Sequence, residues 1–291
     1  MVIKISQLYS QVRRSLMETE DAGTAGMTAR LLLCHVTGKS KEQFLADREM
    51  YVSDDVVHAT EALVSRVKAG EPLAYILGRW EFYGLELIVN SSVLIPRDDT
   101  CAVAELAINK AKELGDDIRI LDLCTGSGCI GLAIASRVPG AKVTLADISN
   151  HALVVARQNV ALNALTKRVT CLPVDALSAP PHFLGKFDLI VSNPPYITTQ
   201  EMKELPNSVA DYEPHLALHG GDDGLDFYRS IAKNYAAALK PGGYLCFEFG
   251  MDQGDDVCAI LEANQYTILE RTRDYNDRER AVIAQLGRKE D

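Results

Sequence analysis

Paired cysteines, long apolar runs and an excess of positive charge are all missing from this 291-residue chain. Its seven cysteines include no C-x-x-C pair and most lie inside apolar runs, so we expect neither a zinc site nor a disulfide framework. No run approaches the roughly 18 consecutive apolar residues that a membrane-spanning helix needs. Residues 1–10 contain no apolar segment typical of a signal peptide. We therefore expect a soluble, cytoplasmic protein with no metal and no membrane partner.

Basic residues are outnumbered by acidic ones: 30 Lys and Arg stand against 40 Asp and Glu, a formal net charge of −10 at pH 7. Proteins that bind phosphate backbones usually carry a basic surface, so the composition disfavours a nucleic-acid partner. The basic stretch 271–280 is a local exception. A solvent-exposed turn is the interpretation we favour for it, and contact with an RNA is the alternative.

The pattern of apolar residues divides the chain into three parts. Apolar residues recur at helical spacing before residue 70, as in Leu8, Val12 and Leu16, which predicts a small helical domain over residues 1–70. Residues Tyr75–Gly84 and Leu85–Val89 are rich in aromatic and β-branched side chains around a turn-like glycine. This predicts a β-hairpin linker over residues 71–97.

Residues 98–291 alternate short apolar runs with helical ones, which is typical of a Rossmann-like, doubly wound α/β domain. The two last strands have no helix between them, so they must pair antiparallel, as a C-terminal hairpin. The predicted strands are Arg119–Cys124, Lys142–Asp147, Val169–Pro173, Phe187–Ser192, Gly243–Phe249, Tyr266–Glu270 and Ala281–Leu286. The predicted helices are Cys129–Arg137, His151–Asn163, Asp226–Leu239 and Gln253–Ala263.

A glycine-rich turn follows the first of these strands. It reads Cys124-Thr125-Gly126-Ser127-Gly128 and leads directly into a helix. Glycines let the backbone approach a ligand closely, and the start of the helix offers free N–H groups. We favour a nucleotide-type cofactor here, with a tight structural turn as the alternative.

Acidic residues follow the next two strands. Asp147 lies about twenty residues beyond the glycines, where a carboxylate can accept hydrogen bonds from both ribose hydroxyls. The alternative for Asp147 is that it caps the next helix. Asp175 and its neighbour Ala176 follow the third strand, where they can meet an adenine edge; a plain surface position is the alternative for Asp175.

The first loop resembles the D-x-G-x-G-x-G motif of class I methyltransferases, which use S-adenosylmethionine and release S-adenosylhomocysteine. The run Asp122–Gly128 carries this resemblance, and the sheet of that class also ends in an antiparallel strand. Cys124 replaces the first glycine of the motif. Because its side chain is small, we expect the turn to form.

The tetrapeptide Asn193-Pro194-Pro195-Tyr196 follows the apolar strand Phe187–Ser192. Its two prolines fix φ and remove two N–H donors, leaving a rigid set of acceptors at the end of a strand where open α/β sheets bind ligands. A planar amide nitrogen is a poor nucleophile, because its lone pair is delocalised. Acceptors for both of its hydrogens, from Asn193 and Pro194, turn the lone pair toward the methyl group, and the Tyr196 ring can hold the planar group. A simple strand-terminating turn is the alternative.

Nearly the whole chain resembles the release-factor glutamine methyltransferase family (HemK/PrmC). The shared segments are Tyr75–Gly78, Glu81-Phe82, Leu94–Arg97, Ser192–Ile197, Tyr212–Pro214, Ala217-Leu218, Gly220-Gly221, Asp223–Leu225, Tyr228-Arg229 and Arg273–Tyr275. The resemblance implies an enzyme of translation termination that methylates the glutamine of the Gly-Gly-Gln loop in peptide-chain release factors. It places the cofactor on residues 124–128, Asp147, Asp175, Ala176 and Asn193, and the glutamine on residues 193–196.

The chain departs from the family pattern in a few places. After Arg97 the family usually reads Pro-Asp/Glu-Thr-Glu, whereas this chain has Asp98-Asp99-Thr100-Cys101. Ala176 replaces a residue that is often larger, and we interpret Cys101 as structural. Two other substrates stay open: a glutamine of a ribosomal protein, and an amino group of DNA or RNA, which the charge disfavours. We expect a monomer that needs no direct contact with nucleic acid.

Overall fold

The computed structural model describes residues 3–287, which form two compact units. The first unit contains the chain up to Gly78 together with Asn207–Tyr212. The second unit contains Arg79–Pro206 and the chain from Glu213 onward. Within the described range, no helix combines the length and the apolar character that crossing a bilayer would require.

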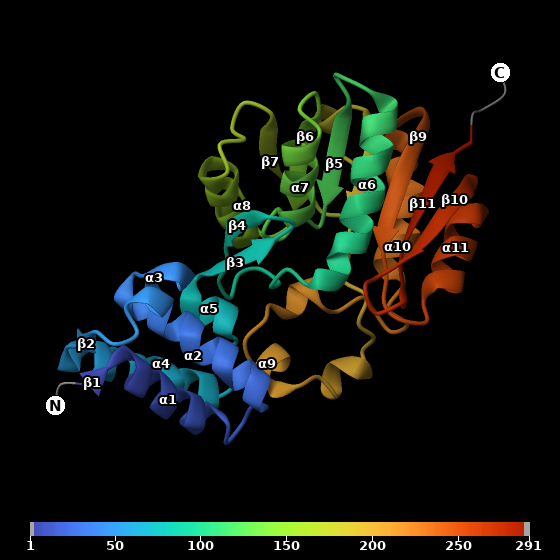
Figure 1. Ribbon diagram of the computed structural model, residues 1–291. Helices are drawn as coiled ribbons and strands as arrows, with labels where there is room; N and C mark the ends of the chain where they lie inside the picture. Colours follow the sequence, from blue (N-terminus) through green and yellow to red (C-terminus); the bar gives the residue numbers. More distant parts are fainter. Residues whose placement is uncertain (1–2, 288–291) are drawn as a thin grey trace. The chain divides into compact units, whose positions relative to one another are not determined.

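Helices build the first unit (Figure 1). Apolar residues on five of them, among them Leu8, Leu32 and Val64, form one buried core, as the helical spacing predicts. Asp21 and Ser40 accept backbone N–H bonds at the helix starts that follow them. The elements are β1 (Ile3–Lys4), α1 (Ile5–Leu16), α2 (Ala22–Thr37), α3 (Lys41–Ala46), β2 (Tyr51–Val52), α4 (Asp54–Lys68), α5 (Leu73–Leu77) and α9 (Asn207–Ala210).

The predicted hairpin is confirmed, but its predicted start is wrong. Tyr75 belongs to helix α5, because Ile76 packs into the core of the first unit and Gly78, with φ of 68°, ends the helix. The hairpin then pairs β3 (Arg79–Phe82) with β4 (Leu85–Ile88) in antiparallel register. Tyr83 and Gly84 form its two-residue turn, both with positive φ, which matches the right-handed twist of the strands.

The second unit is organised by a seven-stranded sheet in the order β10-β11-β9-β8-β5-β6-β7 (Figure 1). Strands β5 to β9 run parallel, and β11 lies antiparallel between β9 and β10. This confirms the predicted α/β sheet with a C-terminal antiparallel hairpin. The strands are β5 (Arg119–Leu123), β6 (Lys142–Asp147), β7 (Val169–Pro173), β8 (Phe187–Ser192), β9 (Leu239–Glu248), β10 (Tyr266–Arg273) and β11 (Glu279–Leu286).

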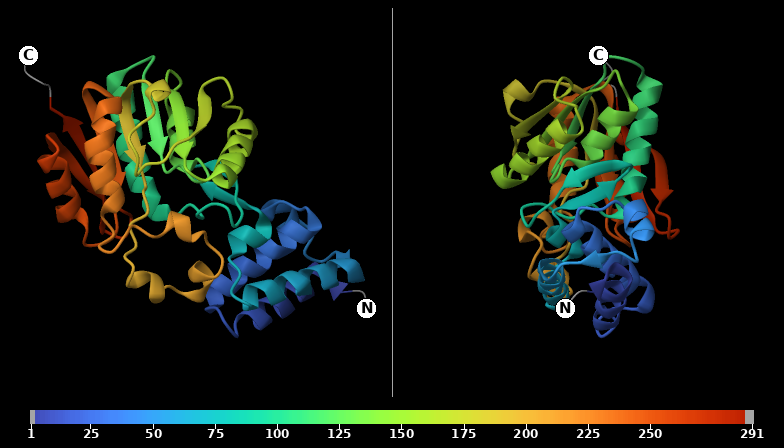
Figure 2. Two further views of the ribbon diagram at one scale, coloured as in Figure 1. Left: turned by 180° about the vertical axis from the view of Figure 1, so that it is seen from behind. Right: turned by 60° about the vertical axis from the view of Figure 1, so that its left-hand side comes forward.

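Helices cover both faces of this sheet. One face carries α6 (Cys101–Leu114), α7 (Cys129–Arg137) and α8 (Asn150–Leu162), and the other carries α10 (Asp226–Asn234) and α11 (Gly254–Ala263), orange in the view from behind (Figure 2). Ile120 packs into the first layer and Leu121 into the second, as the two-residue alternation of a strand requires. A strand buried on both sides has the continuous apolar run seen in the sequence.

Several predicted boundaries of the second unit are wrong. The helix predicted over Asp226–Leu239 ends at Asn234, and the 3-10 turn Tyr235–Ala238 follows it. Leu239 pairs with Phe187 and already belongs to β9, which was predicted to begin at Gly243. Helix α6 was not predicted at all. The last hairpin extends further into charged residues than predicted, because Arg271 forms ion pairs with Asp255 and Glu279 there.

Asn159 of α8 joins the hairpin to the glycine-rich loop. It is fully buried, accepts from Ile88 N at 2.6 Å, and donates to Ile88 O at 3.0 Å and to Ser127 O at 2.9 Å. Replacement by alanine leaves three backbone groups without partners. We expect Asn159→Ala to lower the free energy of unfolding by about 2–4 kcal/mol in urea titrations. Asn163→Ala is the control, because Asn163 lies near the surface, and we expect it to cost under about 1 kcal/mol; equal losses would contradict the role of Asn159.

Candidate active site

The loops with the predicted site residues follow β8, β5, β6 and β7, which are neighbouring parallel strands. Their carboxyl ends therefore meet at one edge of the sheet. After β5 the chain moves to β6 and β7 on one side, and β8 lies on the other side, so this edge is a topological switch point. A cavity opens there with an empty volume of about 1010 Å³, its solvent-filled mouth included.

Most of the predicted site residues line this cavity. Those that do are Cys124, Thr125, Gly126, Ser127, Asp147, Asp175, Ala176, Asn193 and Pro195. Gly128, Pro194 and Tyr196 neighbour these residues in the chain but do not line the cavity. The opposite wall comes from Val93, Pro96, Arg97, Thr100, Pro214 and Leu216, several of which belong to the shared segments of the family.

The glycine-rich turn forms with cysteine in its first position. Cys124 has φ of 62° and Gly126 has φ of 55°, so both take left-handed backbone conformations. This conformation costs a non-glycine residue about 1–2 kcal/mol, so glycine would adopt it at position 124 with less strain than cysteine. Gly128 precedes α7 with φ of 86°, and a Cβ at this position would lie 2.9 Å from Leu145 Cδ1. Glycine is favoured at position 128 mainly by this left-handed backbone conformation, because Leu145 Cδ1 is the end of a flexible side chain.

The Asp122 side chain stabilises the glycine-rich turn and its connection to α7 by two hydrogen bonds. Its Oδ2 accepts from Thr125 Oγ1 at 2.6 Å and from Gly131 N at 2.9 Å. Burial raises the pKa of this carboxyl to about 7, and hydrogen bonds from Thr125 and Gly131 oppose the shift. Its other oxygen, Oδ1, is buried and has no hydrogen-bond partner among residues 3–287.

Asp147 ties the same turn to the end of β6. Its two oxygens accept from Gly126 N at 2.8 Å and from Ser149 N at 2.9 Å. Ser149, not Asp147, accepts from the first turn of α8, so the helix-cap interpretation of Asp147 is wrong. Burial raises the pKa of Asp147. Each carboxylate oxygen keeps a second acceptor position that a ligand hydroxyl can use.

Asp175 and Ala176 form the cavity wall after β7. The Asp175 carboxylate accepts from Leu177 N at 2.9 Å and from Ser178 Oγ at 2.7 Å. These two hydrogen bonds hold residues 175–178 in a local turn. The Asp175 carbonyl accepts from Tyr235 Oη at 2.9 Å. Ala176 is buried, and its carbonyl accepts from Ser230 Oγ at 2.7 Å. Asp175 is thus anchored to the α10 side of the sheet and partly buried.

The tetrapeptide is held rigidly at the end of β8. The Asn193 amide donates from Nδ2 to Thr100 Oγ1 at 3.4 Å, which leaves Oδ1 as an acceptor. Pro194 and Pro195 are buried. Just before the loop, Ser192 Oγ donates to Leu123 O at 2.5 Å and links β8 to β5. The loop therefore presents acceptors in a fixed arrangement.

Tyr196 is fixed by contacts to its backbone. Gln253 Nε2 donates to Tyr196 O at 3.1 Å, while Gln253 Oε1 accepts from Gly250 N at 3.0 Å. Gly224, with φ of 75°, packs so closely that a Cβ there would lie 2.3 Å from Tyr196 O. Burial raises the pKa of the Tyr196 phenol to about 12, so it stays neutral.

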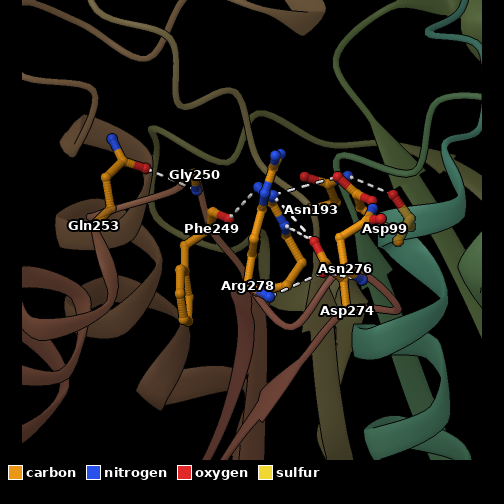
Figure 3. Close-up of polar contacts among 10 residues, drawn as sticks. Asp99, Asn193, Phe249, Gly250, Gln253, Asp274, Asn276 and Arg278 are labelled. Carbon is orange, nitrogen blue, oxygen red and sulfur yellow. Dashed lines mark hydrogen bonds and ion pairs between the residues drawn. The ribbon is translucent and has the colours of Figure 1, made fainter.

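A buried ion-pair cluster lies beside Asn193 and was not predicted. Arg280 of β11 contacts Asp99 and Asp274, each at 3.3 Å, and donates from Nη1 to Phe249 O at 3.3 Å. Figure 3 shows Asp99, Asn193 and Asp274 converging from different parts of the chain. Burial would raise the pKa of Asp274, but hydrogen bonds from Arg278, Asn276 and Arg280 lower it.

The cluster corrects part of one sequence interpretation. Of residues 271–280, expected to be a solvent-exposed turn, residues 275–278 do form an exposed turn, but 271–273 belong to β10 and Arg280 of β11 is only 6% exposed. Arg271 and Arg273 are also paired with carboxylates. These three arginines therefore offer little free positive charge to an RNA.

Glu248, the last residue of β9, is the other site residue that was not predicted. It is 2% exposed, and its Oε2 has no hydrogen-bond partner in the described part of the chain. Burial raises its pKa to about 8; hydrogen bonding with Thr100 and Asn193 and the charge of Arg280 oppose this shift, whereas the charge of Asp99 adds to it. The sequence does carry a signal, a single carboxylate between Phe247 and Phe249 at a strand end.

The departures from the family pattern that follow Arg97 lie in a short turn and at the start of a helix. Asp98–Thr100 form a 3-10 turn, and Cys101 begins α6. Burial raises the pKa of the Cys101 thiol to about 11, so it stays protonated at neutral pH. This agrees with a structural Cys101.

Two shared segments of the family meet at the cavity wall. Arg97 forms an ion pair with Glu213, whose carboxylate is buried, and Glu213 also accepts from Ile95 N at 3.4 Å. The partners Arg97 and Glu213 are 116 residues apart in the chain. Glu213 thereby fixes the segment around Pro96 next to the loop around Pro214.

The strand order, the turn after β5 and the acidic residue after β6 define a class I methyltransferase, an enzyme class that uses S-adenosylmethionine. Comparison with known proteins agrees. Residues 103–211 match the methyltransferase small domain family, and residues 7–78 match the PrmC N-terminal domain. The catalytic domain of hMettl16 has a similar fold, with a TM-score of 0.56 at 14% identity over 83% of this chain and 86% of that one.

Proteins with similar sequences identify the family within this class. A release factor glutamine methyltransferase of Clostridium acetobutylicum is 38% identical over 89% of this chain and 90% of its own length. One of Bacteroides thetaiotaomicron is 34% identical over 96% of this chain and 99% of its own length. The chain therefore belongs to the release factor glutamine methyltransferase family, which confirms the resemblance seen in the sequence.

Proposed function

We propose that this enzyme transfers a methyl group from S-adenosylmethionine to the side-chain amide nitrogen of the glutamine in the Gly-Gly-Gln motif of peptide-chain release factors. The observation that supports the proposal is that Asn193 and Pro195 of the tetrapeptide line the cavity in a chain of this family. The protein substrate is inferred from the relatives, which are release factor glutamine methyltransferases.

The residues around the cavity fit the cofactor. Asp147 offers carboxylate acceptors for ribose hydroxyls, and residues 124–127 bring backbone close to the cavity without large side chains. Val174 and Ala176 supply an apolar wall for the adenine, and Asp175 lies beside them. When bound, the cofactor supplies an electrophilic methyl group. Asn193 lines the same cavity, and we place it next to the methyl group of the bound cofactor.

The chain's own residues prepare the substrate nitrogen. Asn193 Oδ1 and the Pro194 carbonyl accept the two amide hydrogens, which orients the nitrogen and favours the charge that develops on it. The Tyr196 ring packs on the planar amide and keeps it in place. The methylated nitrogen becomes acidic and loses a proton to water, so no general base is required. The raised pKa of Tyr196 keeps its phenol neutral, which agrees with the proposed role of the ring in packing on the amide.

The proposed ribose contact gives a prediction for Asp147. We expect Asp147→Ala to weaken the binding of S-adenosylmethionine about tenfold to hundredfold in calorimetry, because charge-assisted hydrogen bonds to the ribose are lost. Asp256→Ala, on the exposed surface of α11, serves as the control and is expected to bind normally. Unchanged affinity in Asp147→Ala would remove Asp147 from the ribose site.

The proposed function is tested by incubation with labelled S-adenosylmethionine and, in separate reactions, a release factor, a large-subunit ribosomal protein and DNA. We expect label on the release factor, at the glutamine of its Gly-Gly-Gln motif, as located by mass spectrometry. Label on the ribosomal protein alone would keep the chemistry and change the substrate. Label on DNA alone would overturn the proposal, and the net charge of −10 argues against that outcome.

A further inference from the structure

The side chain of Asn193 has two orientations of nearly equal shape, related by exchange of its oxygen and nitrogen. Only the orientation with Oδ1 toward the substrate accepts an amide hydrogen, since Nδ2 is purely a donor. The groups that contact the Asn193 side chain on the side away from the substrate therefore decide whether the tetrapeptide can accept the substrate hydrogen. Thr100 Oγ1, 3.4 Å from Asn193 Nδ2, is one of these groups.

Glu248 is the other group, and the sheet register brings it there. Ser192 of β8 pairs in parallel with Phe247 of β9, so the next residue of each strand, Asn193 and Glu248, lie side by side. Both side chains point to the face of the sheet covered by α6, since Val191 and Cys246 two residues earlier pack there. Thr100 directly precedes α6 on that face and also hydrogen-bonds with Glu248.

We propose that Glu248 is a positioning residue, whose carboxylate accepts from Asn193 Nδ2 and thereby keeps Asn193 Oδ1 turned toward the substrate amide. This inference rests on the proposed function and deepens it. Glu248 does not line the cavity, so it acts through Asn193 and Thr100. The buried Oε2, unpartnered within residues 3–287, is free to take part in this contact.

The protonation state of Glu248 then affects catalysis. The charged groups that face it are Arg280, which lowers its pKa, and Asp99, which raises it. Tyr196, Tyr228, Cys101 and Cys129 also face it, but burial raises the pKa of each, so they stay neutral. The pKa of Glu248, about 8, thus lies near physiological pH.

The sign of the pH effect follows from the hydrogen-bonding capacity of a carboxyl group. An ionised Glu248 only accepts, so Asn193 must turn Nδ2 inward and Oδ1 outward. A protonated Glu248 can also donate to Asn193 Oδ1, which stabilises the inactive orientation. The rate at saturating substrate and cofactor is therefore expected to rise as pH increases through the pKa of Glu248.

Steady-state kinetics of Glu248→Gln test this. Glutamine can donate or accept at every pH, so we expect kcat to fall about tenfold to hundredfold with KM for S-adenosylmethionine unchanged, and the rise of kcat between pH 7 and pH 9 to disappear. Because Glu248 acts through Asn193, adding Glu248→Gln to Asn193→Ala should cause no further loss. Glu262→Gln, on the surface of α11, is the matched control and should keep the wild-type profile.

A second measurement does not depend on activity. The side-chain NH₂ signals of Asn193 are identified in ¹⁵N–¹H spectra of the wild-type enzyme by their loss in Asn193→Ala. We expect them to shift with pH around the pKa of Glu248, and not to shift in Glu248→Gln. Signals that stay constant between pH 6 and pH 10 would overturn the inference. A pH-dependent shift without methylation of any release factor would refute the proposed function and leave the contact itself supported.

Discussion

Asn193→Ala is expected to lower the rate of release-factor methylation by at least about a hundredfold while binding S-adenosylmethionine almost as well as the wild type. Alanine removes Oδ1, the acceptor that orients the substrate nitrogen and strengthens as charge develops on it. The interaction is used mainly in the transition state, so kcat falls more than KM rises. The loop itself should stay in place, because Pro194, Pro195 and the Gln253 bond to Tyr196 hold it.

Single-turnover assays with labelled cofactor measure the rate, and calorimetry measures the affinity. Asn264→Ala is the control, because Asn264 follows the last residue of the ten-residue helix α11 and its side-chain amide donates to Ile260 O of the same helix turn. Its rate should match the wild type. Undiminished turnover in Asn193→Ala would refute the mechanism.

Gly224→Ala is expected to have the second-largest effect, a loss of about a hundredfold in kcat. Gly224 has φ of 75°, and an added Cβ would lie 2.3 Å from Tyr196 O and 2.6 Å from Gln253 Nε2. One of these is a backbone atom of the tetrapeptide, so relief of the clash must move the active-site loop. We also expect the free energy of unfolding to fall by about 1–3 kcal/mol, from the unfavourable φ.

The control separates backbone strain from the clash. Gly115 has φ of 87° and no heavy atom within 4 Å of an added Cβ, so Gly115→Ala carries the strain alone. It should lose stability and keep its kcat. If both variants lose activity equally, the close packing of Gly224 on Tyr196 does not control catalysis. Urea titration and steady-state kinetics of the two variants decide this.

Local patterns were sufficient for most of the catalytic sheet. Lys142–Asp147 and Phe187–Ser192 are strands with the predicted bounds, and the strand predicted over Arg119–Cys124 ends one residue earlier, because a strand buried on both faces needs a continuous apolar sequence. Helix α5 shows the limit of such patterns. Residues Leu73–Leu77 are apolar, β-branched or aromatic and fit a strand, but their packing against the helical core decided in favour of a helix.

The candidate site divides in the same way. Asp147 and Asn193 were predicted because Asp147 ends one apolar strand and Asn193 directly follows another, and carboxyl ends of parallel strands share one edge. Glu248 also ends such a strand, yet its importance depends on its neighbours Asn193 and Thr100, which lie elsewhere in the chain. Arg280 was expected in an exposed turn, since nothing local indicates that Asp99 and Asp274 enclose it.

The amino-acid sequence alone determined the class of fold and the family, and it predicted the edge of the sheet at which we place the cofactor. Periodicity and strand-end motifs are local, so they can be recognised without coordinates. Only the tertiary structure decided which distant groups support the site: Glu248 behind Asn193, Glu213 on Arg97, and Arg280 between two carboxylates. Buried polar groups must find partners, and strand register and loop packing, which are non-local, select those partners.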